Sequence, residues 1–138
     1  MWKYCAIFLL FSGCAPSTLS DFRHEGESRC REILIVLEQI EDREQLLRSE
    51  PALKKHFETL ITLMIEARKY QESHPEDALT ESEYSLVVES ELQEELRRIY
   101  QIEGGREVVE RTQHEALVRL DAFERELSRK KGYYKRQN

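Results

Sequence analysis

The sequence predicts an all-α fold, an antiparallel bundle of three to four helices. Apolar residues recur at spacings of three and four along most of the 138-residue chain, as they do on one face of a helix. Only 5 Gly and 3 Pro are present, too few for a disordered linker or for an all-β fold with many tight turns. The length fits a single domain.

The first helix is expected over residues 25–48. Its apolar run, Ile33-Leu34-Ile35-Val36-Leu37, could be a buried strand if it stood alone. The charged segments on both sides carry no turn signal, and they favour a helix. Ser49-Glu50-Pro51 marks the expected boundary, because Ser49 can cap a helix and Pro51 suits its first turn.

The second helix is expected over residues 51–72, followed by a break at Pro75, which biases the preceding residue away from helical dihedrals. Thr80 and Glu83 have the spacing of a capping box, which predicts the start of a third helix that runs to about Ile102. A fourth helix follows to about residue 131. The residues expected to form the core of this bundle are Leu37, Leu60, Met64, Leu92, Leu120 and Phe123.

Gly104-Gly105 admits two interpretations. The apolar stripe stays in phase through the pair, as it would in a helical hairpin plus one long coiled-coil helix. Two adjacent glycines cost about 2 kcal/mol inside a helix, however, and glycine suits a helix end. We therefore expect a turn, and the continuous helix is the alternative.

Charge is distributed unevenly along the chain. The net charge of −6 argues against a basic nucleic-acid binder, so we expect no nucleic-acid partner. Residues 14–128 hold 15 basic and 27 acidic side chains, and 15 − 27 = −12, whereas the last ten residues hold no acid. Their five cations either contact an anionic surface such as lipid headgroups, or complement the end of a helix and continue as a frayed tail. These cations are Arg129, Lys130, Lys131, Lys135 and Arg136.

No motif for catalysis or for a metal is found. The chain has no Cys-x-x-Cys pair, no His-Glu-x-x-His, no Gly-rich phosphate loop and no Gly-x-Ser-x-Gly elbow. Many carboxylates stand near Lys or Arg at helical spacing, as on a solvated helix face. We therefore expect no enzyme, no cofactor and no metal site. The four histidines lie in four different segments: His24, His56, His74 and His114.

The N-terminus has the parts of a secretory signal. Lys3 precedes an apolar run over residues 5–11, and small residues follow. The run is too short to span a bilayer. Phe11-Ser12-Gly13-Cys14 resembles the lipobox of bacterial lipoprotein precursors, although Phe11 replaces the usual Leu. The resemblance implies cleavage before Cys14 and acylation of Cys14, which anchors the mature chain to a membrane.

This resemblance divides the chain into a signal peptide (1–13), a lipidated Cys with a tether (14–24), a helical domain (25–131) and a basic tail (132–138). In such lipoproteins an Asp after the Cys favours retention at the inner membrane. Ala15 stands there instead and implies the outer membrane, facing the periplasm or the surface. Cys30 is then the one cysteine left in the mature body, so no internal disulfide can form, and we expect its burial as a small hydrophobe.

The expected function is that of a membrane-anchored envelope lipoprotein whose helical domain is a non-catalytic protein-interaction, assembly or accessory module. A pilotin-like escort of a secretion-channel subunit is a sharper version that rests on size and helicity alone. The alternative is a periplasmic helical stress chaperone or metal-sensing protein, although the Leu-Thr-x-x-Gln repeat of that group is missing. A structural spacer is the third option, and a continuous helix through Gly104-Gly105 would favour it.

Overall fold

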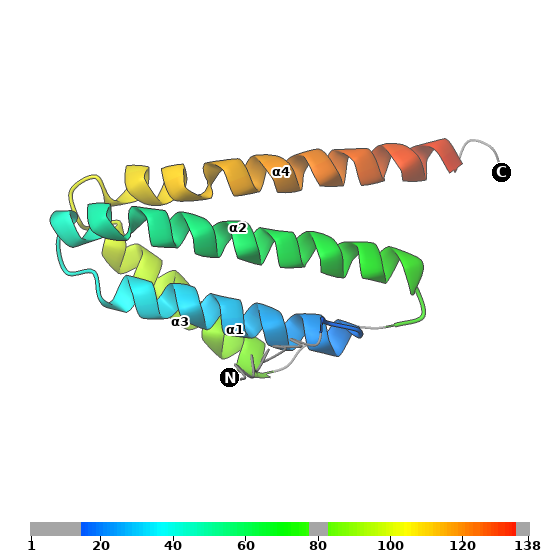
Figure 1. Ribbon diagram of the computed structural model, residues 1–138, viewed down its shortest axis with the longest axis horizontal. Coiled ribbons are helices and arrows are strands. Elements are labelled where there is room, and N and C mark those ends of the chain that lie inside the picture. The colour runs from blue at the N-terminus through cyan, green and yellow to red at the C-terminus, as the bar shows by residue number, and fades with distance from the viewer. Residues whose placement is uncertain (1–14, 78–82, 135–138) are drawn as a thin grey trace, which may run out of the picture.

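The computed structural model describes residues 15–77 and 83–134. Within them the chain forms four helices and no strand: α1 (Leu19–Glu38), α2 (Arg43–Ser73), α3 (Glu83–Ile99) and α4 (Gly105–Tyr134). Successive helices run in opposite directions (Figure 1). The expected all-α bundle is confirmed.

The helices do not pack as a closed square. Extended contacts join α1 to α2, α2 to α4 and α1 to α3, and α3 makes no extended contact with α2 or α4 in the described part of the chain. In Figure 1, α1, α2 and α4 lie side by side, and α3 crosses α1 obliquely. Helices α2 and α4 run parallel, as two ion pairs show: Glu50 pairs with Arg111 near their starts, and Glu72 pairs with Lys131 near their ends.

The core lies towards the end of the bundle that holds the α1–α2 and α3–α4 turns. Leu37 is fully buried there, as expected. Leu60 and Leu92 pack against the core but are only partly buried. The expectation for Met64 was wrong, since 45% of this residue is exposed. The buried cluster consists of Ile33, Leu37, Ile40, Leu46, Leu53, Phe57, Ile99, Val108 and Val109.

The first two helices meet ten residues earlier than the sequence suggested: α1 ends at Glu38, not near residue 48. Asp42 caps α2, and its carboxylate accepts the backbone N–H of Gln45 at 2.8 Å. The Gln45 side chain in turn accepts the N–H of Glu41 at 2.6 Å. These two bonds satisfy backbone donors that a helix start leaves unpaired, so the chain can turn without Gly or Pro.

Pro51 therefore lies inside α2 and not in its first turn. A proline there removes one backbone hydrogen bond, which costs about 3 kcal/mol in a helix interior. Leu46 and Leu53, on either side of it, are fully buried and hold both halves of the helix against the core. The Pro51 ring itself is exposed. Packing thus overrides the local preference for a break.

The expected turn at Gly104-Gly105 is confirmed, and the continuous helix is wrong. The φ angle of Gly104 is +73°, in the left-handed region that favours glycine. A Cβ on Gly105 would collide with the backbone carbonyl oxygen of Ile99. Each glycine is therefore required for its own reason.

Two arginines tie the turns at this end of the bundle together. Arg98 of α3 donates to the carbonyl oxygens of Ile40 and Leu37 at 2.6 and 2.7 Å, and so satisfies acceptors at the end of α1. Arg43 of α2 donates to the carbonyl oxygen of Glu103 at 3.0 Å. The closed end of the bundle is held by both packing and charged hydrogen bonds.

Candidate functional site

An apolar groove lies between α2, α3 and α4, with a volume of about 220 Å³. Seven of its eight lining residues are apolar, and Gln113 is the polar one. The lining residues are Phe57, Leu60 and Ile61 of α2, Leu92 and Leu96 of α3, and Gln113, Ala116 and Leu117 of α4.

The groove exists because α3 leans on α1, away from α4. Helices α3 and α4 are joined by a tight turn and diverge with distance from it, and α2 forms the floor of the gap between them. Leu117, on the α4 wall, remains 46% exposed. Val118, the next residue, is 50% exposed but does not line the groove. Leu117 is the one lining residue that is exposed, whereas Phe57, Ile61 and Ala116 are buried.

A second depression, of about 290 Å³, adjoins the groove at Leu92, which lines both. Its walls come from α1 and α3 and include Cys30 and Glu89. Burial, with Glu89 and Glu27 nearby, raises the pKa of the Cys30 thiol. A thiol with a raised pKa is a poor nucleophile. Cys30 is half-buried, in partial agreement with the expected role as a small hydrophobe.

The floor and the α4 wall are joined by polar contacts between α2 and α4. Arg111 binds Glu50 through two bonds of 2.5 and 2.8 Å, which lower the pKa of Glu50 and raise that of Arg111. Lys54 pairs with Glu115 at 2.9 Å. Arg119 donates to the carbonyl oxygen of Glu58 at 2.9 Å. Each exposed pair contributes little alone, but the series fixes the two parallel helices in one register.

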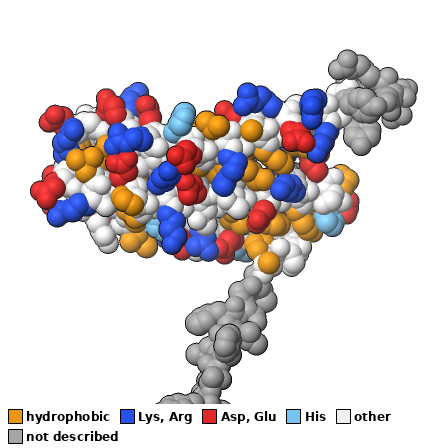
Figure 2. Space-filling view, turned by 45° about the horizontal axis from the view of Figure 1, so that its top comes forward, with side chains coloured by type: hydrophobic (Ala, Val, Ile, Leu, Met, Phe, Trp, Pro, Cys, Tyr) orange, Lys and Arg blue, Asp and Glu red, His pale blue; other side chains and the backbone are white. Residues whose placement is uncertain are grey.

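Helix α3 carries more acidic than basic residues, although it lines the groove with Leu92 and Leu96 alone. It contains five glutamates, and its two basic residues, Arg97 and Arg98, lie in the last turn. Glu89, Glu91 and Glu94 are exposed. By contrast, the face shown in Figure 2 carries Lys and Arg side chains interspersed with Asp and Glu, so it presents no field of a single sign. The excess of negative charge on α3 is a local feature.

At the opposite end of the bundle, the start of α1 lies beside the end of α2, which in turn lies beside the end of α4. Phe22 of α1 lies 5.7 Å from Tyr70 of α2, between ring centroids, and Lys131 of α4 pairs with Glu72 of α2 at 2.8 Å. The start of α1 and the ends of α2 and α4 therefore lie together (Figure 1).

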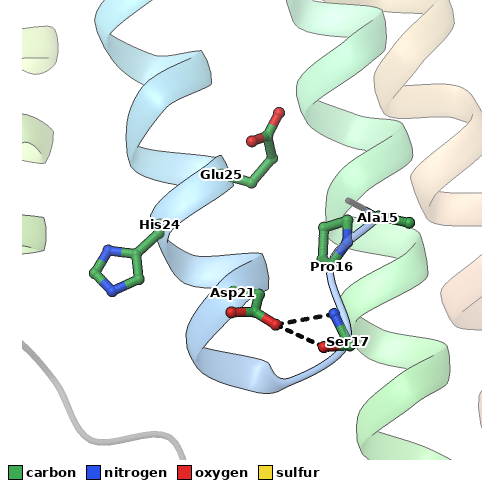
Figure 3. Close-up of a pocket in the computed structure, with 6 residues that line it drawn as sticks. All are labelled: Ala15, Pro16, Ser17, Asp21, His24 and Glu25. Atoms are coloured by element: carbon green, nitrogen blue, oxygen red, sulfur yellow. Dashed lines mark hydrogen bonds between the residues drawn. The ribbon is translucent and has the colours of Figure 1, made fainter. Parts of the chain in front are cut away.

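The chain enters α1 through a tight cap. Thr18 and Asp21 form a capping box, and Asp21 also accepts the backbone N–H and the hydroxyl of Ser17 at 3.0 and 2.9 Å (Figure 3). The bond from the Ser17 backbone, followed by those from other nearby groups, lowers the pKa of Asp21. Residues 19–24, expected in the tether, are thus helical. Between position 14 and the helix only residues 15–18 remain.

The five basic residues of the expected anionic-surface contact are divided. Arg129, Lys130 and Lys131 are exposed near the end of α4, where Lys130 pairs with Glu126 at 3.2 Å and Lys131 with Glu72. Lys135 and Arg136 lie outside the described residues, as do Cys14 and the whole lipobox.

The remaining polar chemistry is dispersed. Among residues 15–77 and 83–134, no three His, Cys, Asp or Glu side chains come together in a group that could hold a metal ion. His56 approaches Glu32 at 3.3 Å, and His74 stacks on Tyr70 at 4.1 Å between ring centroids.

No described helix is long and apolar enough to cross a membrane. Comparison with protein-family models, curated proteins and solved structures gives no match.

The sequence did not identify the groove. Leu60 and Leu92 were expected in the core, and Leu96 belonged to the apolar stripe of the third helix, but a stripe does not show which part of it stays uncovered. The groove forms because α3 packs on α1 and not on α4, and this choice of neighbour has no signal in the sequence. The groove thus arises from packing and not from a motif.

Proposed function

We propose that this chain is an envelope lipoprotein, anchored through a lipid on Cys14, whose helical body binds a protein partner in the α2–α3–α4 groove. It serves as a non-catalytic assembly or accessory module. The observation that carries the proposal is the exposed apolar groove, because an apolar concavity with a single polar lining residue binds side chains and provides no groups for catalysis.

The arrangement of the bundle is compatible with an anchor at Cys14. With only residues 15–18 between that position and α1, a lipid there holds the α1 start close to the membrane. Ile61 is the α2 groove residue nearest the anchored end and lies 12 residues before the end of α2 (73 − 61 = 12), so the groove begins about 18 Å along the helix from that end, at 1.5 Å per residue. A partner can therefore reach the groove without entering the bilayer.

The basic end of α4 supports the same orientation. Arg129, Lys130 and Lys131 lie at the end of the bundle where α1 begins. We propose that they contact anionic headgroups, adding an electrostatic attraction to the lipid anchor. The spacer option loses the observation that favoured it, because the chain turns at Gly104-Gly105.

Site-specific photo-crosslinking in native envelopes tests the proposal. A photoreactive residue at Leu117 should form one dominant crosslinked product, whereas the same residue at Val118, equally exposed but outside the groove, should form little of it. Equal products from both positions would show that the groove is not the contact surface.

The anchor is tested separately by metabolic labelling with a fatty acid. The unmodified chain should incorporate the label, and the Cys14→Ser variant should remain unlabelled and uncleaved. Normal labelling of that variant would contradict the anchor while leaving the groove untouched.

A further inference from the structure

The two halves of α4 are packed very differently. Every buried residue described in α4 lies at or before Ala116, and none is buried from residue 117 to residue 132. Leu120, Phe123 and Leu127 are covered only in part. Within the described chain, α2 is the only helix with which α4 makes extended contacts (Figure 1). We call residues 120–134, the last part of this helix, the α4 arm.

Charged side chains of α2 face the arm. The ammonium group of Lys69 lies 5.9 Å from the centroid of the Phe123 ring, and Arg68 approaches Glu124 at 3.9 Å. Both members of the second pair are more than 40% exposed, so their attraction is small and is screened by salt. Because its half-buried apolar stripe meets charged side chains, the arm belongs to the least stable part of the fold.

The sequence of the arm has the pattern of a helix that lies on a membrane surface. Leu120, Phe123 and Leu127 are spaced by three and four residues and share one face, which Lys130 and Lys131 border on its two sides. Residues 125–131 hold four basic side chains and one acidic one, and 4 − 1 = 3, whereas the whole chain has a net charge of −6. An apolar face with basic residues beside it binds anionic bilayers through both burial and charge.

The arm also lies at the end of the bundle where α1 begins. Lys131 pairs with Glu72 near the end of α2, and Tyr70 of α2 lies 5.7 Å from Phe22 of α1, between ring centroids. The proposed lipid anchor on Cys14 would hold this end at the membrane. An anionic lipid surface is then the partner that the arm meets first.

We infer that the α4 arm separates from α2 and lies on an anionic lipid bilayer as an amphipathic helix. Leu120, Phe123 and Leu127 then enter the boundary between headgroups and acyl chains, and the basic side chains meet the lipid phosphates. The inference rests on the membrane location in the proposed function and not on the groove. It goes beyond the headgroup contact proposed above, because it requires the arm to leave α2.

Vesicle binding with and without a covalent link between α2 and the arm tests the inference. The protein comprises residues 14–138 with Cys14→Ser and Cys30→Ser, so it carries no lipid of its own. Arg68→Cys and Glu124→Cys are added, because these side chains approach each other across the two helices. A short bismaleimide links the two cysteines, and the same variant capped with a monofunctional maleimide is the control.

Flotation measures binding to vesicles of phosphatidylcholine alone, or of equal parts phosphatidylcholine and phosphatidylglycerol. The capped control should bind the mixed vesicles at least about tenfold more tightly than the neutral ones. The linked form should bind the mixed vesicles about tenfold less tightly than the control, since its arm cannot leave α2. Far-UV circular dichroism confirms that both forms are folded.

A matched pair of substitutions tests the apolar stripe without changing the charge. In the unlinked Cys14→Ser chain, Leu127→Gln should weaken binding to the mixed vesicles by about tenfold or more. Val118→Gln should leave binding nearly unchanged, because Val118 is exposed and lies nine residues from Leu127, on the opposite face of α4. Without vesicles, the amides of the arm should exchange hydrogen faster than those of residues 108–116.

Equal binding of the linked and capped forms would overturn the inference, since the arm would then have no need to leave α2. It would also be overturned by equal binding to the two kinds of vesicle, by equal losses in Leu127→Gln and Val118→Gln, or by equally slow exchange in both halves of α4. Fatty-acid labelling of Cys14 and crosslinking at Leu117 report on the proposed function separately. If both succeed while the arm fails, only the inference about the arm is wrong.

Discussion

Replacing Gly104 by Ala tests the turn that separates α3 from α4 and so opens the groove. An L-residue at φ +73° costs about 1–2 kcal/mol. The new Cβ would also lie 2.6 Å from a terminal nitrogen of Arg43, which must move and weaken its bond to the Glu103 carbonyl. Arg43 is half-exposed, so this second effect adds about 0.5–1 kcal/mol. The variant should lose about 1.5–3 kcal/mol of unfolding free energy.

Gly132→Ala is the matched control. Gly132 lies within α4, and a Cβ there meets no atom within 4 Å, so Ala should be neutral or stabilise the fold by up to about 1 kcal/mol. Urea unfolding followed by circular dichroism at the helical band measures both variants. If Gly104→Ala matched or exceeded the stability of the unmodified chain, the left-handed turn would be wrong and a continuous helix would be favoured again.

Other positions give predictions of different size. Leu37→Ala should cost about 2–5 kcal/mol in urea unfolding because Leu37 is fully buried, whereas Met64→Ala should cost under about 1 kcal/mol; equal costs would contradict the location of the core. Arg98→Ala should cost about 1.5–3 kcal/mol by removing two bonds to the end of α1, and a neutral result would contradict that cap. Pairing with Arg111 lowers the pKa of Glu50, so this pair should stabilise the fold above the ordinary pKa of a glutamate and lose that effect as the pH falls through the lowered value. The stability difference between Glu50→Gln and the unmodified chain should therefore shrink in acid, and a difference that grew would contradict the pairing.

The helical class of the fold was predictable because it depends on a repeating pattern. Spacings of three and four persist along the chain, and Gly104-Gly105 is a strong local signal for a turn. The break after Glu38 was missed because it contains neither Gly nor Pro. Its signal was the pair Asp42 and Gln45, which has the spacing of a helix cap.

The helix boundary expected at Pro51 was wrong for the opposite reason: a proline is present there, but no helix begins or ends at it. Its local preference is to end or begin a helix, but burial of Leu46 and Leu53 outweighs the lost backbone bond. Tertiary packing of this kind has no signature in a short stretch of sequence. Met64 was assigned to the core for a similar reason, since its spacing suits the apolar stripe and the absence of a covering helix is visible only in three dimensions.

Mapping of the partner by methyl NMR tests the central claim most directly. The protein captured at Leu117 is added to the body with labelled Leu and Ile methyl groups. The signals of Leu92, Leu96 and Leu117 should shift or broaden, while those of Ile35, exposed on α1 outside the groove, should stay in place. Shifts gathered around Ile35, with the groove signals unchanged, would contradict the account.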